Sequence, residues 1–124
     1  MAKPRPKYLN LIRIRLPLPG LVSILHRISG AALFLFLPGL LCLFQASLGA
    51  PDDFDVVKGA MANPLVKLTL IGLLWAFLHH LCAGIRYLAL DLDYGTDLAP
   101  ARASSWAVLA VSIALTAILG ARLW

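Results

Sequence analysis

Two adjacent histidines, His79 and His80, lie within the run 68–85, which contains no charged residue. A helix rises about 1.5 Å per residue, so a run of this length nearly crosses the roughly 30 Å hydrocarbon core of a bilayer. Imidazole rings at such a depth are costly unless they pair with another group or bind a metal centre. Neighbouring helix residues point about 100° apart, so the two rings must face different partners.

The composition indicates a membrane protein. Hydrophobic residues make up 60% of the 124 positions and charged residues only 14%, and three runs are free of charge: 28–51, 68–85 and 103–121. We therefore predict an all-α integral membrane protein with one three-helix domain over residues 1–124, spanning at about 21–49, 64–90 and 103–123. A cleaved signal peptide is the alternative for the first run, but that run is too long for a signal core.

The distribution of charge predicts the orientation. Basic residues precede the first span and flank the loop between the second and third: Lys3, Arg5, Lys7, Arg13, Arg15, Arg27, Arg86 and Arg102. The opposite side carries an acidic turn at 52–55. The positive-inside rule puts the amino terminus in the cytoplasm and the carboxyl terminus in the periplasm of a bacterial inner membrane. The net charge of +5 is then a topology signal and not a sign of nucleic-acid binding.

Proline and glycine mark the predicted element boundaries. We expect loops at 50–64 and 86–102, with Pro100 inside the second, and a kink at Pro38 within the first span. No repeat or second domain is predicted.

The sequence offers no catalytic motif of its own. Cys42 and Cys82 lack the C-x-x-C spacing of an iron–sulfur or zinc site, and the chain contains no glutamate, phosphate-binding loop or nucleophile elbow. Any redox chemistry must come from a cofactor or from partners.

Haem b is the metal centre that an imidazole at this depth favours. Neutral imidazole is a usual axial ligand, and no covalent C-x-x-C-H attachment motif is present. Gly84 lies one turn from His80, and Arg86 follows about 9 Å along the helix, at the height of haem propionates. We predict His80 as the ligand and His79 as a packing residue, the alternative being that both form interhelical hydrogen bonds.

The chain supplies no obvious second axial ligand. His26 is the only other histidine, and it is expected at the cytoplasmic mouth of the first span, at a different depth from His80. A second histidine ligand would then come from another polypeptide, which predicts an obligate membrane partner.

Ser23 and Arg27 form a second candidate site. They are four residues apart, so a hydroxyl and a guanidinium project from one helix face at headgroup depth. These donors suit the carbonyl of a membrane quinone. The alternative is a helix-capping serine and an arginine that extends to the headgroups.

These motifs resemble a known family. The residues Ser-Ile-Leu-His-Arg-Ile-Ser-Gly at 23–30, preceded by Arg5-Pro6 and followed by His80-x-x-x-Gly84-Ile85-Arg86 and Asp91, are similar to the cytochrome b membrane-anchor subunit of succinate dehydrogenase, respiratory complex II. The resemblance covers nearly the whole chain.

The resemblance implies a heterotetramer of a flavoprotein with FAD, an iron–sulfur subunit and two membrane anchors that reduce ubiquinone. It implies His80 as an axial haem ligand, with the sister anchor supplying the other. Ser23 and Arg27 would line the ubiquinone site, and His26 and Arg27 would approach the propionates.

At three positions, 79, 87 and 91, the role of the residue stays open. Asp91 would serve proton delivery or be a surface carboxylate at a helix end. Many relatives have histidine where Tyr87 stands, and an aromatic residue at position 79. Two other classes stay open: a haem-free anchor of the fumarate-reductase type and a membrane scaffold without a redox role.

Overall fold

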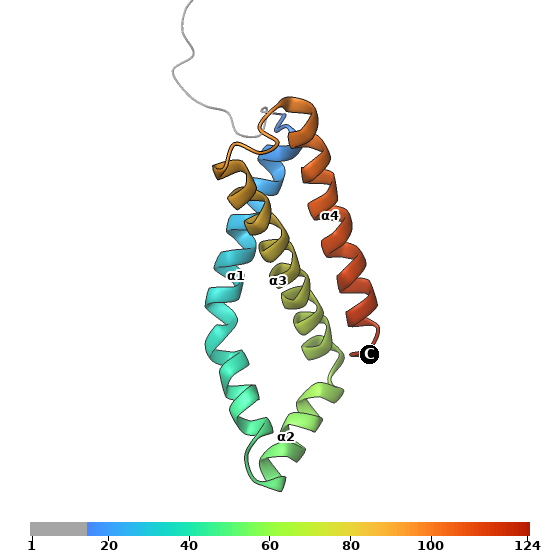
Figure 1. The fold of residues 1–124 in the computed structure, drawn as a ribbon. Coiled ribbons are helices and arrows are strands. Elements are labelled where there is room, and N and C mark those ends of the chain that lie inside the picture. Colours follow the sequence, from blue (N-terminus) through green and yellow to red (C-terminus); the bar gives the residue numbers. More distant parts are fainter. Residues whose placement is uncertain (1–14) are drawn as a thin grey trace, which may run out of the picture.

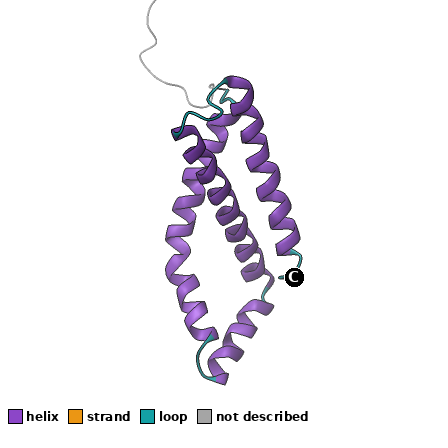
Figure 2. Ribbon diagram, in the orientation of Figure 1, coloured by secondary structure: helices purple, strands orange, loops and turns teal. Residues whose placement is uncertain are grey.

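The computed structural model describes residues 15–124, and the basic residues Lys3, Arg5, Lys7 and Arg13 and the Arg5-Pro6 pair lie outside the described part. The described residues form four helices and no strand: α1 (Leu18–Ser47), α2 (Pro51–Ala62), α3 (Pro64–Asp91) and α4 (Leu98–Gly120) (Figures 1 and 2). The helices α1, α3 and α4 are each long and apolar enough to span a membrane. The predicted all-α fold with three membrane-spanning helices is confirmed.

The helix α2 corrects the loop predicted at 50–64. Pro51 occupies its first position, where its missing N–H is not needed, and the Asp53 carboxylate accepts a hydrogen bond of 3.2 Å from the Ala50 N–H. The acidic turn predicted at 52–55 is therefore part of a helix, for which the proline and the aspartates are start signals. With 12 residues α2 is too short to span, and it connects α1 to α3 at the far end of the bundle (Figure 1).

The helix α4 begins earlier than the predicted residue 103. Pro100 lies in its first turn, which has no intrahelical N–H bond to lose, so the proline is accommodated there instead of in a loop. The α3–α4 connection therefore shortens to 92–97. It turns through Asp93 and Gly95, whose φ angles are 61° and 75°.

The helix α1 continues through Pro38 without a break and bows away from α3 in its middle (Figure 1). Between the two helices lies an apolar groove of about 380 Å³ whose walls include Gly39, Leu40 and Leu73. The expected kink therefore takes the form of a bend in a continuous helix.

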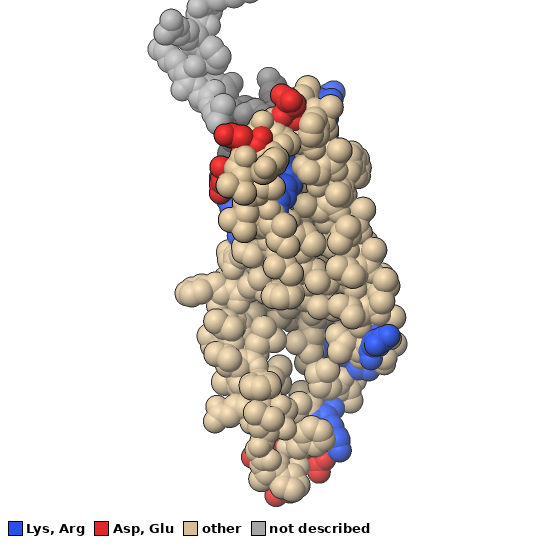
Figure 3. All heavy atoms as spheres, in the orientation of Figure 1, with Lys and Arg blue, Asp and Glu red and all other residues tan. Residues whose placement is uncertain are grey.

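The core of the described chain is small, and α3 lies at its centre, in contact with both α1 and α4. Val22, Ala83 and Val108, from the three long helices, form its buried apolar cluster. Large side chains of α1 such as Phe34 and Leu35 are 77% and 73% exposed. Figure 3 shows a middle surface without charged residues and charged residues at the two ends, as expected for a chain that faces lipid or another membrane helix.

Candidate functional site

The His80 ring is held by two groups of α1. Its Nδ1 lies 3.0 Å from the His26 carbonyl oxygen and 3.3 Å from the Ser29 hydroxyl. A carbonyl can only accept, so the bond to His26 requires a proton on Nδ1. The neutral ring then carries its lone pair on Nε2, and no described residue forms a hydrogen bond with that atom.

Gly30 lets the His80 ring lie directly against α1. A Cβ atom at residue 30 would lie 2.7 Å from His80 Cε1, closer than real Cβ contacts, and at a tight 3.2 Å from Nδ1. At Gly84, by contrast, the nearest atom to such a Cβ is His26 Nε2, at an ordinary 3.8 Å. At the α1–α3 contact, packing therefore requires a glycine at residue 30 and not at residue 84.

The structure corrects the expected depth of His26. The rings of His26 and His80 stack with centroids 4.1 Å apart and planes 9° from parallel. The prediction was wrong because α1 begins before its charge-free run and α3 ends after its own, at the same end of the bundle. His26 lies eight residues, about 12 Å, into α1, and His80 lies eleven residues, about 16 Å, from the end of α3.

Stacking of this kind does not make His26 a second axial ligand. Two axial imidazoles must point their ring edges at one iron from opposite sides, and a face-to-face pair 4.1 Å apart leaves no place for the metal between its nitrogens. The prediction that His26 and His80 do not bind one iron together therefore depends on ring geometry and not on depth.

His79 lies inside the chain. The residue has no exposed surface, its ring packs on Trp75 with centroids 5.2 Å apart, and neither ring nitrogen has a hydrogen-bond partner among the described residues. A ring enclosed in this way has no open side for a porphyrin.

The Tyr87 ring contacts His26 edge-on with centroids 5.1 Å apart. Its hydroxyl is buried, and no hydrogen-bond partner for it lies in the described part of the chain. The side chain packs against the core cluster of Val22, Ala83 and Val108.

Arg86 is turned toward α4 and not toward His80. It is 8% exposed, its Nε donates to Ser104 Oγ at 2.8 Å, and its Nη2 donates to the Ala101 carbonyl at 3.3 Å. These bonds fasten the last turns of α3 to the first turns of α4. Among its nitrogens, only Nη1 has no bond to a described residue.

We expect Arg86→Met to destabilise the membrane domain. Hydrogen bonds of a charged donor contribute roughly 1.5–3 kcal/mol, and the variant loses two of them, although the Ser104 hydroxyl keeps its own bond to the Ala101 carbonyl at 3.2 Å. The thermal midpoint of the purified complex should fall. Arg102→Met, at an exposed position of α4, is the control and should leave it unchanged. Equal midpoints in the two variants would contradict the fastening role.

The predicted quinone residues lie near the start of α1. Ser23 is half-buried and Arg27 is exposed, and neither forms a side-chain hydrogen bond with another described residue. Asp91 is exposed at the last position of α3. The two α1 residues share a helix stripe with Gly30, so they lie one to two turns from the His80 contact.

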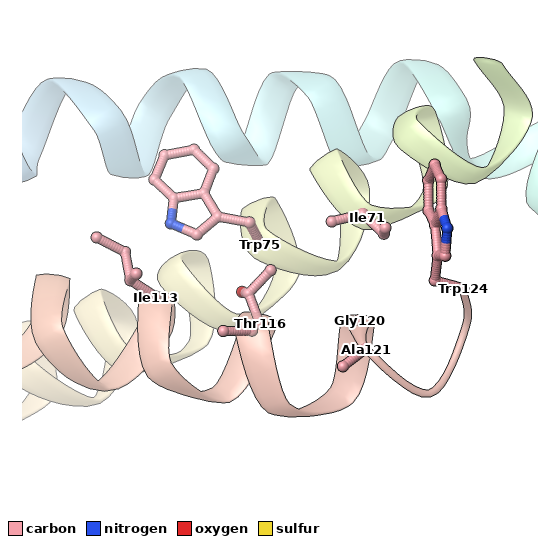
Figure 4. Close-up of a pocket in the computed structure, with 8 residues that line it drawn as sticks. Ile71, Trp75, Ile113, Thr116, Gly120, Ala121 and Trp124 are labelled. Atoms are coloured by element: carbon pink, nitrogen blue, oxygen red, sulfur yellow. The ribbon is translucent and has the colours of Figure 1, made fainter. Parts of the chain in front are cut away.

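An apolar groove between α3 and α4 lies away from the histidine pair. It encloses about 440 Å³ between α3 and α4, toward their Pro64 and Gly120 ends, and Figure 4 shows Trp75, Thr116 and Trp124 along it. The Thr116 hydroxyl is already bonded to the Ser112 carbonyl at 2.7 Å, so the groove presents almost only hydrocarbon. The indole N–H groups of Trp75 and Trp124 are the nitrogen donors among its lining side chains.

Sequence reasoning missed Ser29 and Gly30 as the support of His80. The signal for them was the Ser-Gly pair one turn after His26, because small residues allow close helix contact in membranes. No described group of three or more His, Cys, Asp or Glu residues could hold a metal ion by itself. The site offers one oriented imidazole.

The fold and the site define a class of protein: a three-span membrane subunit that presents one imidazole in the half of its bundle where α1 begins and α3 ends. The family model of the succinate dehydrogenase/fumarate reductase transmembrane subunit matches residues 1–119. The chain belongs to this family.

The relatives support the same assignment. A Coxiella burnetii protein named succinate dehydrogenase cytochrome b556 subunit is 35% identical over 121 residues, which cover 97% of both chains. Proteins of the same name from Paracoccus denitrificans and Rickettsia felis are each 33% identical, over 92% and 93% of this chain and 88% and 90% of their own lengths. The predicted resemblance is confirmed.

Proposed function

We propose that this chain is the anchor subunit of a succinate:quinone oxidoreductase that binds haem b jointly with a sister anchor and forms part of the ubiquinone-reduction site. The observation that carries the proposal is the oriented His80 ring, whose Nδ1 donates to the His26 carbonyl at 3.0 Å. A ligating histidine commonly donates its other ring N–H to such a carbonyl, which fixes the tautomer and the ring orientation. The relatives' name, cytochrome b556 subunit, agrees with this reading.

The residues present fit haem b. His80 would hold the iron through Nε2, which forms no hydrogen bond with a described residue, and the His26 ring stacks on one face of the imidazole. When bound, haem would supply a one-electron redox centre beside the quinone site. His26 and Arg27 would contact the propionates. A propionate contact from Arg86 would have to use Nη1, because its other donors face α4.

The second axial ligand would come from the sister anchor. His26 is stacked against His80, and His79 is enclosed in the core, so neither histidine can approach the far side of the same iron. The exposed apolar surface of α1 leaves room for another membrane helix. We propose that the iron–sulfur and flavoprotein subunits dock at the cytoplasmic end, with the whole complex in the bacterial inner membrane.

For the quinone, Ser23 and Arg27 would act together. The Ser23 hydroxyl would donate to one carbonyl of ubiquinone, and the Arg27 guanidinium would stabilise the negative charge that develops on the reduced oxygen. Both side chains are free of bonds to other described residues, so they are available to a ligand. Asp91, at the exposed end of α3, would pass protons from the cytoplasm.

The test compares two electron acceptors in the assembled complex. We expect Arg27→Ala to lower succinate-dependent ubiquinone reduction by about 100-fold, the typical loss of one stabilising donor, because the developing charge loses its partner. Succinate oxidation with a soluble artificial acceptor should persist. Arg102→Ala is the matched control and should leave both rates unchanged.

Each outcome separates the remaining candidates. Unchanged quinone reduction in Arg27→Ala and Ser23→Ala would contradict the quinone site and favour a scaffold role. A reduced-minus-oxidised spectrum of the parent complex without a b-type band would instead favour a haem-free anchor.

A further inference from the structure

We propose that Ser29 is a positioning residue that sets the electron-donating strength of His80 by sharing its hydrogen-bond acceptor. The inference rests on the proposed role of His80 as haem ligand and deepens it. The Ser29 hydroxyl has no part in the haem and quinone contacts proposed above.

Three polar atoms meet at this point of the α1–α3 contact. The Ser29 hydroxyl donates to the His26 carbonyl at 2.9 Å, and the same carbonyl accepts from His80 Nδ1 at 3.0 Å. The third side of the triangle, from Ser29 Oγ to His80 Nδ1, measures 3.3 Å. Ser29 is 2% exposed, so water does not compete for these atoms.

The proton positions follow from the acceptors. The carbonyl has no proton, so both Ser29 and His80 must donate to it. The single hydroxyl proton is thereby used, and the hydroxyl can only offer a lone pair to the Nδ1 proton at the longer distance. His26 is therefore the main acceptor for His80, and Ser29 withdraws electron density from that acceptor.

The strength of the hydrogen bond at Nδ1 sets the basicity of Nε2, the ring nitrogen that would bind the iron. A stronger acceptor at Nδ1 makes the imidazole more basic at Nε2, and a more basic axial ligand favours the oxidised iron. By polarising the His26 carbonyl, the Ser29 hydroxyl weakens that acceptor for His80. In a site of low dielectric constant such competition is felt more strongly than in water.

A hydroxyl bonded to its own helix is common, so the chain provides an internal comparison. Ser112 donates to the Leu109 carbonyl at 3.1 Å with the same spacing of three residues, and it has no exposed surface. It forms no hydrogen bond with a histidine. Ser29 and Ser112 thus differ in the contact with His80, while their burial and local bond are alike.

The experiment measures the haem midpoint potential in the purified complex. We expect Ser29→Ala to retain haem and to shift the potential to more negative values, because the freed carbonyl binds Nδ1–H more strongly. Ser29→Cys, a weaker donor of similar size, should shift it less in the same direction. Ser112→Ala should keep the parent potential.

The outcomes distinguish the tuning role of Ser29 from the proposed role of His80 as haem ligand. A parent complex without haem would overturn the haem assignment itself. An unchanged or more positive potential in Ser29→Ala with haem retained would overturn only the role of Ser29. Loss of haem from both Ser29 variants would make Ser29 an assembly residue and would equally overturn the tuning role.

Discussion

His80→Ala is expected to abolish haem b binding in the purified complex, whereas His79→Phe is expected to leave it intact. The two residues are neighbours in sequence, but the structure gives them opposite surroundings. His80 is half-buried with its Nε2 unbonded, and His79 is enclosed against Trp75. Only the first has an edge that an iron can reach.

The size of the expected effect follows from the ligand's role. Loss of a group that merely orients a ligand costs roughly 10- to 100-fold in metal affinity, and loss of the ligand itself should cost more. His79→Phe keeps the aromatic contact with Trp75 and removes two ring nitrogens that have no partner among the described residues. It should therefore fold at least as well as the parent chain.

The measurement is haem content per complex, from the pyridine haemochrome spectrum, with subunit stoichiometry determined on the same sample. A b-type spectrum in His80→Ala together with its loss in His79→Phe would reverse the assignment of the two positions. Loss in both, with the complex intact, would point to a requirement for this helix face as a whole.

The elements of the fold were predictable because the membrane imposes them. Charge-free runs of spanning length leave the backbone no alternative to a helix, so the three long helices follow from hydropathy. The helix α2 was missed because nearly all of it lies outside the apolar runs. A proline followed by two aspartates, as at 51–53, is typical both of a turn and of the start of a helix. Pro100 was misjudged for the same reason.

The site was predictable in its parts and not in its contacts. Residue type and expected depth were enough to select the two histidines and the donors at 23 and 27 as candidates. Which of their atoms are in contact depends on how far each helix continues past its apolar run. The stacking of His26 on His80 arises from that extension, and no spacing within one helix encodes it. The contact of Ser29 with His80 could likewise not be predicted, because it depends on how α1 and α3 are placed along each other.

Gly30→Ala is expected to displace His80 and to lower haem content, although the change adds a single methyl group. The new Cβ would lie 2.7 Å from His80 Cε1 and 3.2 Å from Nδ1. A free side chain would swing aside, but Nδ1 is bonded to the His26 carbonyl, so the ring can move only by breaking that bond or by separating α1 from α3. Such overpacking costs roughly 1–3 kcal/mol.

Gly39→Ala is the matched control on the same helix. A Cβ there meets nothing within 4 Å, so the change should be neutral or stabilise α1 by up to about 1 kcal/mol through the better helix propensity of alanine. Haem content and thermal midpoint are measured for both variants. Gly30→Ala should lose haem in proportion to the displaced ring, and Gly39→Ala should keep it. Full haem content with an unshifted spectrum in Gly30→Ala would mean that α1 and α3 do not approach closely at this level, and the hydrogen bonds from His80 to α1 would lose their basis.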